Sequence, residues 1–178
     1  MTPSFQTPPD PCLLIGRRSL RQLRAILERE SGGRAATVLR EAGFASGEAL
    51  FQALTDFAGK HYGVERPQAL DATRLAIALD EFFTVSHWGH LALSEESPGI
   101  LSLDSPDWAE ATDGAAPFPS CHFTAGLLAD LFTRLAGRQA AVMEVECRSR
   151  GDGRCRFLVG GPGTLTAVHQ RMAKSGGW

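Results

Sequence analysis

The chain has 178 residues, a formal net charge of −2 and 43% hydrophobic residues. This length supports one domain with a substantial core and is short for two. The pI near 6.2 gives no sign of the basic surface that nucleic-acid-binding domains carry. No stretch of about eighteen apolar residues is present, so no membrane span is expected. The N-terminus does not resemble a secretory signal, and we therefore expect a cytoplasmic protein.

The first residues form a separate segment. Residues 1–15 are rich in proline and predict an extended arm, whereas 16–175 predict a single folded domain. Within the domain, Arg17 to Glu30 carries leucines at helical spacing and ends at Ser31-Gly32-Gly33. The arginines of this helix lie opposite its leucines, which predicts a solvent-exposed basic face.

Three further helices are predicted before the middle of the chain. One runs from Arg34 to Ala42 and stops at Gly43, and another is capped by Ser46 and runs to about Tyr62. Asp71 caps the next helix. Its apolar stripe consists of Leu75, Leu79, Phe82 and Phe83. We interpret this stripe as core packing that could also line a ligand cavity.

The periodicity then changes from helix to strand. Apolar and polar residues alternate from Val85 to Leu93, which predicts a strand, and a turn at Ser97-Pro98-Gly99 leads to a second strand at Ile100 to Leu103. The polar stretch from Asp104 to Pro119, rich in alanine, glycine and proline, predicts a long loop.

The C-terminal third combines one long helix with a hairpin. Ser120 is predicted to cap a helix that ends at Gly137. Strands are expected at 139–149 and 154–159, joined by a turn in which Gly151 and Gly153 supply positive φ angles. A last helix is expected from Thr164 to about 174. The fold class is therefore α+β: an antiparallel sheet packed against helices, with a helical N-terminal half.

Three cysteines and one glutamate stand out in this C-terminal third. Cys147 and Cys155 flank the hairpin turn, Glu144 precedes Cys147 by three residues, and Cys121 lies at the start of the preceding helix. Three thiolates and one carboxylate form a closed tetrahedral set for zinc. A regular strand would place Glu144 and Cys147 on opposite faces, so a shared ion requires a bulge. Spacing alone leaves free buried cysteines, or a Cys147–Cys155 disulfide, as alternatives. At the first turn of a helix, Cys121 is expected to have a lowered pKa.

The segments PSCHFTAG, EVECRSRGDGRCRF and HWGHLAL resemble the four-vinyl-reductase domain family. Its small-molecule-binding fold also occurs in phenol-responsive bacterial activators and, more distantly, in vesicle-tethering subunits and haem-based nitric-oxide sensors. In the zinc-bearing phenol sensors the metal is held by Cys, Glu, Cys and Cys. The resemblance carries these ligands onto Cys121, Glu144, Cys147 and Cys155, and it implies zinc as the cofactor.

The resemblance also implies a cavity for an apolar ligand near the metal. It would be lined by the stripe Leu75, Leu79, Phe82 and Phe83 and by the residues His87, Trp88, His90 and His122. Each histidine could instead be an ordinary core or surface residue. The phenol sensors use a helix histidine that this chain lacks between residues 72 and 83, so a larger aromatic or an apolar ligand fits better than phenol.

These features favour a binding module over an enzyme. We expect a zinc-stabilised sensor or carrier of a hydrophobic or aromatic molecule, acting as a homodimer and through a regulatory protein partner. The alternative is a 4-vinyl reductase-like protein, or an accessory that binds a tetrapyrrole, although the chain shows no dinucleotide-binding motif. A haem-based gas sensor would need an axial histidine, for which His61 is the candidate.

Overall fold

A computed structural model describes residues 16–112, 114 and 116–174. The predicted arm at 1–15 lies outside these described residues. Most of the helices come first in the chain: α1 (Arg17–Ser31), α2 (Ala35–Ala45), α3 (Gly47–Tyr62) and α4 (Ala72–Val85). Two strands follow, β1 (Ala92–Ser97) and β2 (Ile100–Ser105), and then α5 (His122–Ala136), β3 (Ala141–Glu146), β4 (Cys155–Gly160) and α6 (Pro162–Lys174). Short 3-10 turns occur at Gly32–Arg34, Pro67–Ala69 and Arg148–Arg150.

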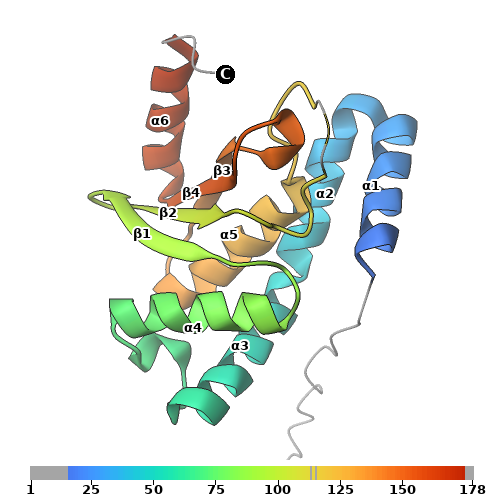
Figure 1. Cartoon of the computed structure of the whole chain (residues 1–178). Helices are drawn as coiled ribbons and strands as arrows, with labels where there is room; N and C mark the ends of the chain where they lie inside the picture. The colour runs from blue at the N-terminus through green and yellow to red at the C-terminus, as the bar shows by residue number, and fades with distance from the viewer. Residues whose placement is uncertain (1–15, 113, 115, 175–178) are drawn as a thin grey trace, which may run out of the picture.

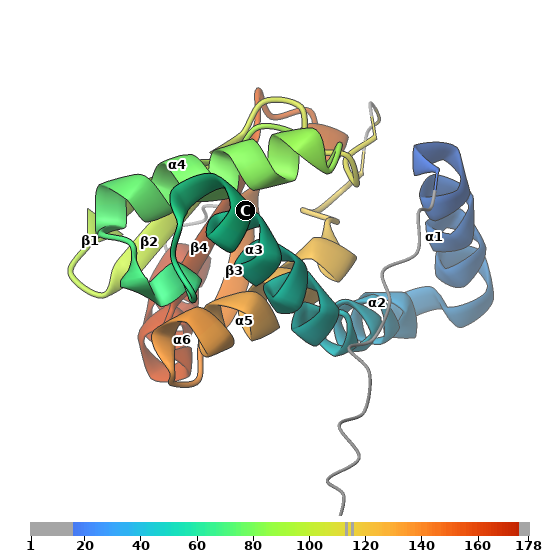
Figure 2. The ribbon, with the colours of Figure 1, turned by 90° about the horizontal axis from the view of Figure 1, so that it is seen from below.

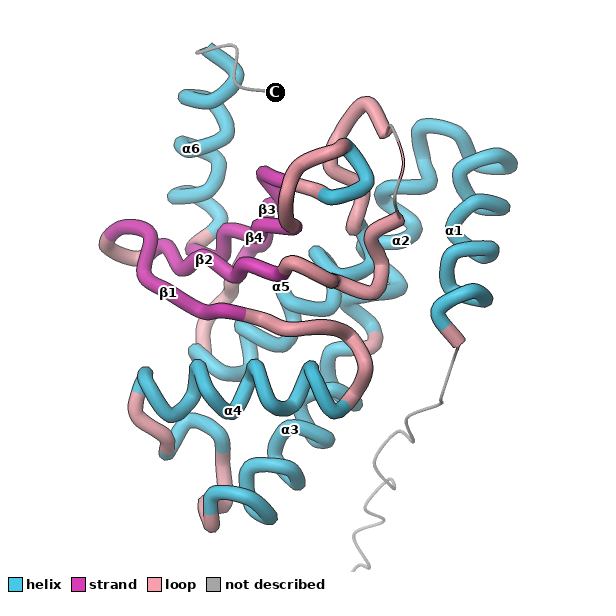
Figure 3. Tube along the Cα trace, in the orientation of Figure 1, coloured by secondary structure: helices cyan, strands magenta, loops and turns pink. Residues whose placement is uncertain are grey.

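The four strands form one antiparallel sheet in the order β1-β2-β4-β3. Successive side chains of β4 point to opposite faces of the sheet. Phe157 and Val159 belong to the main core on one face, while Leu158 belongs to a second, smaller cluster with Leu165 of α6 on the other. Figure 1 shows α6 on the side of the sheet opposite to α5, and Figure 3 shows the long loops on either side of β1 and β2. This confirms the predicted α+β class.

The main core lies between the sheet, α3, α4 and α5. Its fully buried members include Leu54, Leu79, Phe83, Leu128 and Phe157. The predicted stripe of α4 therefore packs into the core, and the side chain of Asp71 caps α4 as predicted, accepting a hydrogen bond from Arg74 N at 2.8 Å. No helix of the described residues has both the length and the apolarity to cross a membrane.

Helix α2 corrects the prediction that Gly43 ends it. The helix continues to Ala45, and Gly43 lies where α2 crosses α5. A Cβ on Gly43 would overlap the carbonyl oxygen of Phe123, and one on Gly126 would overlap that of Arg40. The two glycines therefore allow close approach of the two helix backbones. Ser46 occupies the predicted N-cap position of α3, but its side chain makes no cap hydrogen bond. The prediction for α5 was wrong, because Cys121 rather than Ser120 is its N-cap residue, also without a side-chain cap.

The strand predicted from Val85 to Leu93 is wrong over most of its length. Helix α4 extends to Val85, and β1 begins only at Ala92. The intervening residues form a tight loop in which His87 has φ 62° and Gly89 has φ 124°. The amide of Trp88 donates to Phe83 O at 2.9 Å, so local hydrogen bonds to the end of α4 replace the expected ladder.

Helix α1 stands at the edge of the molecule beside α2 (Figures 1 and 2). Its basic face is not wholly exposed as predicted: Arg24 is buried and donates to Glu110 O at 3.2 Å and to Ser120 Oγ at 2.6 Å. Conversely, Leu23 and Ile26 are 50% and 36% exposed. Arginine side chains, above all Arg24, therefore contribute polar contacts between this helix and the rest of the domain.

Candidate metal centre

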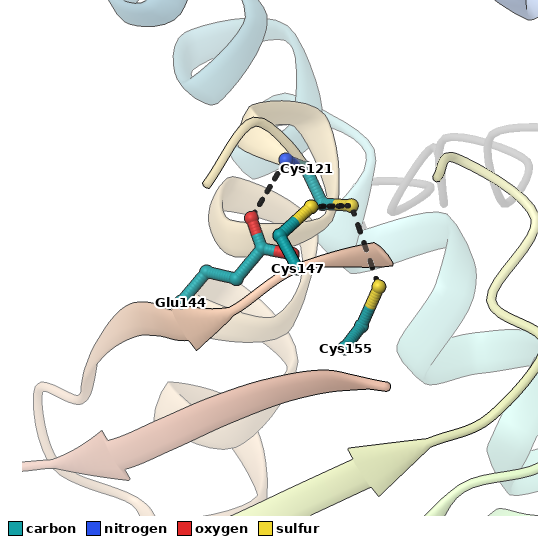
Figure 4. A group of neighbouring side chains, drawn as sticks. All are labelled: Cys121, Glu144, Cys147 and Cys155. Atoms are coloured by element: carbon teal, nitrogen blue, oxygen red, sulfur yellow. Dashed lines mark hydrogen bonds between the residues drawn. The ribbon is translucent and has the colours of Figure 1, made fainter. Parts of the chain in front are cut away.

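The structure brings the four predicted metal ligands together. Cys121 immediately precedes α5, Glu144 lies in β3, Cys147 follows β3, and Cys155 begins β4. All four are buried, and one potential ligand atom from each lies within 4.8 Å of the others. Figure 4 shows the three sulfurs and the carboxylate of Glu144 converging between the start of α5 and the hairpin. This cluster could hold a metal ion.

A bulge in β3 makes the cluster possible. Glu144 pairs with Phe157, but the next pair joins Glu146 to Arg156, so the register shifts by one residue at this point. The extra residue lets Glu144 and Cys147 reach the same face, which a regular strand with period two would prevent. The bulge expected from the spacing is thus present where the ligands need it.

The turn after β3 fixes the position of Cys147. The amide of Cys147 donates to the carboxylate of Asp152 at 2.7 Å, and Arg150 Nε donates to the same oxygen at 2.9 Å. Gly151 adopts φ 101°, whereas Gly153 is not among the glycines with positive φ, so one glycine rather than two makes the reversal. The carboxylate of Asp152 therefore holds the turn and the Cys147 backbone together.

The sulfur separations match a metal site. Cys121 Sγ lies 3.8 Å from Cys147 Sγ and 4.0 Å from Cys155 Sγ. A tetrahedron with Zn–S bonds of about 2.3 Å places its sulfurs roughly 3.8 Å apart. A disulfide has sulfurs about 2.05 Å apart, and the three described cysteines are free. The predicted alternative of a Cys147–Cys155 disulfide is therefore not what the structure contains.

The carboxylate of Glu144 leaves one oxygen for an ion. Its Oε2 accepts a hydrogen bond from Cys121 N at 2.8 Å, while Oε1 is buried without a hydrogen-bond partner. Buried polar atoms are rarely left unpaired, and a cation is one of the groups that satisfies them. The donor set and the unpaired oxygen together fit a divalent metal.

The pKa values of the four cluster residues are shifted because four acidic side chains lie close together and are buried. Burial, followed by the charge of Cys147, raises the pKa of Glu144 to about 9. Hydrogen bonding with Cys147 raises the pKa of Cys121, so its expected lowering by the helix N-terminus is overridden. The pKa of Cys147 is lowered instead, because the thiols of Cys121 and Cys155 donate to its sulfur. Without a cation the cluster retains protons; full ionisation of all four groups requires a positive ion.

A second buried carboxylate, Glu110, supports the start of α5. It accepts hydrogen bonds from Phe123 N at 3.1 Å, Thr124 N at 2.7 Å and Thr124 Oγ1 at 2.5 Å. Trp108 Nε1 donates to the same threonine hydroxyl at 2.7 Å. These contacts fix the helix that begins next to Cys121.

The residues that hold α5 lie in the predicted long loop between β2 and α5. That loop is present, but Trp108 and Glu110 within it are each 1% exposed. Sequence analysis missed both residues, because their neighbours are polar or small and carry no apolar periodicity. The single available signal was a tryptophan in an otherwise polar stretch.

The proposed ligand wall is divided between core and surface. Leu79, Phe82 and Phe83 are buried in the main core, and Leu75 is partly buried against it. Trp88 is also partly buried. Its ring lies parallel to that of Phe123, with centroids 6.2 Å apart, and 5.7 Å from that of Trp108.

The two histidines beside Trp88 lie on the surface. His87 is exposed, and its carbonyl accepts a hydrogen bond from Arg17. The side chain of His90 is 59% exposed, with Nδ1 3.4 Å from Asp80 Oδ1. The structure therefore brings Trp88, but neither histidine, into contact with the aromatic core.

His122 lines a different feature, an open groove of about 770 Å³. The groove borders the metal cluster, between α6, β3 and the start of α5, and Cys121 and Glu144 contribute to its lining. Burial and the nearby Arg40 lower the pKa of His122. His122 is thus a proposed ligand residue that lines a preformed opening.

Comparisons with known proteins agree with this fold. Residues 108–161 match the family model of the four-vinyl-reductase domain. An uncharacterized protein of Methanocaldococcus jannaschii is 31% identical over 81 residues, which is 46% of this chain and 44% of that protein. The chain therefore spans less than half the length of the curated relative it matches.

Two solved structures share the architecture. The phenol-responsive sensory domain of the transcription activator PoxR, crystallised with phenol, superposes with a TM-score of 0.60 at 17% identity, covering 84% of this chain and 76% of that chain. A vinyl-4-reductase family protein from Methanocaldococcus jannaschii gives a TM-score of 0.52 at 22% identity, covering 83% and 82%. At such identities these likenesses show the fold, and the family match adds the sequence signal. The resemblance to the four-vinyl-reductase domain family is therefore confirmed, and residues 108–161 carry it.

Proposed function

We propose that the chain is a zinc-stabilised module that binds a small hydrophobic or aromatic molecule as a sensor or carrier and acts through a partner. One observation carries this proposal: three buried cysteine sulfurs at metal-site distances around a carboxylate with an unpaired oxygen. Residues 16–175 would form the binding unit.

Zinc is the metal that suits these ligands. Thiolates select soft or borderline ions, and zinc accepts three sulfurs and one oxygen in a tetrahedron without redox chemistry. Since the protein supplies all four ligands, the ion has no open position for water. Such a closed site stabilises the fold and does not activate a substrate.

The ion would join two parts of the domain. Cys121 precedes α5, whereas Glu144, Cys147 and Cys155 belong to the β3–β4 hairpin. Both parts contribute to the core: Leu128 of α5 and Phe157 of β4 are fully buried there. Metal binding would therefore stabilise the arrangement of α5 on the sheet, and with it any cavity or groove between these elements.

A hydrophobic ligand is supported by the composition of the surrounding surfaces. The wall of Leu75, Leu79, Phe82 and Phe83, closed by Trp88, is apolar, and so are several side chains of the groove at His122. Carbon-lined surfaces favour apolar ligands with few polar groups. The PoxR sensory domain was crystallised with phenol; for this chain, a related kind of ligand is our proposal.

A second copy of the chain and a regulatory protein are the proposed partners. The exposed Leu23 and Ile26 of α1 support self-association, because they form an apolar stripe on a peripheral helix. We also propose the cytoplasm as the compartment, since thiolates that hold a metal need reducing surroundings.

Metal analysis of the purified chain tests the proposal. We expect about one zinc per chain, loss of zinc in Cys155→Ser, and a lower melting temperature in that variant. Cys12→Ser changes the remaining cysteine of the chain, which lies outside the described residues, and serves as the matched control with zinc retained. The metal site would be refuted if the purified wild-type protein contained no zinc and if a chelator left its melting temperature unchanged.

The ligand is tested on the same preparation. Native mass spectrometry should detect a co-purified hydrophobic molecule lost on denaturation. A visible absorption band of a tetrapyrrole would instead favour the alternative of a chlorophyll-precursor accessory. A chain that carries zinc but retains neither kind of molecule, nor binds one when supplied, would contradict the sensor-or-carrier role while leaving the metal site intact.

A further inference from the structure

The groove that borders the metal cluster has both apolar and polar lining residues. It is bounded by α6, the edge strand β3, the start of α5 and the segment before it. Figure 1 shows α6 and α5 on opposite sides of this strand. Residues that decide its chemistry are Arg40, Phe118, His122, Met143, Leu165 and His169. Its volume of about 770 Å³ is that of a small-molecule site.

One part of this lining is apolar. Phe118 is 65% exposed, an unusual state for a large aromatic side chain, and it lines the groove together with Met143 of β3 and Leu165 of α6. Together these three side chains provide aromatic, thioether and branched aliphatic contacts. An apolar ligand body can bury its surface against them.

The other part of the lining is polar and carries one permanent positive charge. Arg40 is an exposed, permanent cation on α2, and the imidazoles of His122 and His169 also contribute to the lining. The one carboxylate in the lining, Glu144, is 7% exposed, and its Oε2 accepts from Cys121 N. The groove therefore offers one permanent cation, Arg40, without an exposed acidic group among its lining residues.

We propose that this groove binds an amphipathic organic acid, with the carboxylate at Arg40 and the apolar body against Phe118, Met143 and Leu165. This inference rests on the proposed function and names the ligand class and its place. It differs from the expectation of a cavity at the α4 wall, because Leu79 and Phe83 there are fully buried and would have to separate before a ligand could enter. The groove needs no such repacking.

The position of the groove connects its occupant to the metal centre. Cys121 and Glu144 line the groove and also belong to the metal cluster. A ligand in the groove would therefore contact the same start of α5 and the same strand β3 that the ion joins. Ligand binding and metal binding are then expected to strengthen one another, since each fixes the same two elements.

The test compares two soluble probes that differ in their head group, 4-phenylbutyrate and 4-phenyl-1-butanol. Each is titrated into the zinc-loaded full chain while backbone amide signals are followed by NMR. We expect 4-phenylbutyrate to shift amides of 141–144 and of 163–169. The neutral alcohol should bind roughly five- to tenfold more weakly, because it lacks the charge that pairs with Arg40.

Two variants and their controls locate the site. Arg40→Gln should weaken 4-phenylbutyrate by about five- to tenfold and leave the alcohol unchanged, and Thr166→Trp should obstruct both probes. The controls are Arg138→Gln and Thr73→Trp, two exposed positions outside the groove lining. Melting curves of all four variants verify that each is folded, so a loss of binding reports the groove.

The outcomes separate this inference from the proposed function. The groove site would be overturned if both probes bound equally, if Arg40→Gln had no effect, and if the shifted amide signals belonged to α4 and to 86–91. That result would still leave a module that binds small molecules. Binding of neither probe also overturns the groove site. Loss of the metal site itself would be seen separately in the zinc content of the same sample.

Discussion

Substitution of Gly43 by alanine tests whether the crossing of α2 and α5 positions the metal centre. A Cβ at residue 43 would overlap Phe123 O and lie 2.9 Å from both Leu127 N and Phe123 C. These are backbone atoms, so no side-chain rotation can relieve the contact, and α5 must move. Since α5 begins next to Cys121, the movement reaches the sulfur cluster.

The expected magnitude follows from two opposing terms. The overlap with Phe123 O is more severe than the two 2.9 Å contacts, so the cost lies at the upper end of the usual range for overpacking, ~3 kcal/mol. Replacing glycine by alanine within a helix contributes about 1 kcal/mol in the other direction. We therefore expect Gly43→Ala to lower the free energy of unfolding by about 2 kcal/mol. For a chain of this size, this lowers the melting temperature by roughly 4–8 °C.

The assay is thermal and chemical unfolding of the zinc-loaded chain, with zinc affinity measured in parallel by competition with a chelator. Gly163→Ala in α6 is the matched control: a Cβ there meets nothing within 4 Å, so stability should be unchanged or slightly higher. If Gly43→Ala is as stable as Gly163→Ala and holds zinc equally well, the close crossing of α2 and α5 does not support the metal centre.

Three further predictions follow from single contacts. Tyr62 is the chain's one tyrosine, and its hydrogen bond to Glu81 raises its pKa to about 12, so ultraviolet titration should show ionisation well above the ordinary value of 10.0. The associated stabilisation is complete below pH 10 and is lost as the pH rises through about 12. Trp108→Phe removes the donor to Thr124 and should lower the free energy of unfolding by about 1–2 kcal/mol in urea denaturation. Arg24→Gln should increase amide hydrogen exchange across α1, since that helix contacts the domain through this buried guanidinium.

Each of these predictions has its own control. Glu81→Gln should return the midpoint of the Tyr62 titration toward 10.0, and an unchanged midpoint would remove Glu81 as the cause. If the hydrogen bond from Trp108 to Thr124 accounts for the loss of stability, then Trp108→Phe should change the free energy of unfolding very little in a Thr124→Val background, as a double-mutant cycle would show. Arg29→Gln changes an exposed arginine of the same helix; equal exchange in both α1 variants would argue against a docking role for Arg24.

The cluster of candidate metal ligands could be predicted from two sources: the spacing of the residues suggested it, and the family resemblance favoured it over free cysteines or a disulfide. Glu144, Cys147 and Cys155 lie within one hairpin. Three thiols with one carboxylate form a ligand set that is typical of a zinc site. The required bulge followed from the strand period alone. The helices α3 and α4 were also recoverable, since their apolar residues recur at helical spacing over several turns.

What sequence reasoning missed depends on contacts between distant segments. Gly43 was interpreted as a helix stop, whereas it is placed within α2 by the approach of α5. The alternation from Val85 to Leu93 imitated a strand, although hydrogen bonds to the end of α4 fold that segment into a loop. Glu110 caps a helix that starts more than ten residues later, and no local pattern marks such a partner.

The placement of the four metal ligands has a consequence for the order of events during synthesis. All of them lie between Cys121 and Cys155, so the ribosome has released α1 to α4 before the last sulfur exists. Until α5 emerges, Gly43 has no helix to pack against. The nascent N-terminal helices must therefore wait for their partner, and the ion proposed for this cluster can be held by all four ligands only after Cys155 has been made.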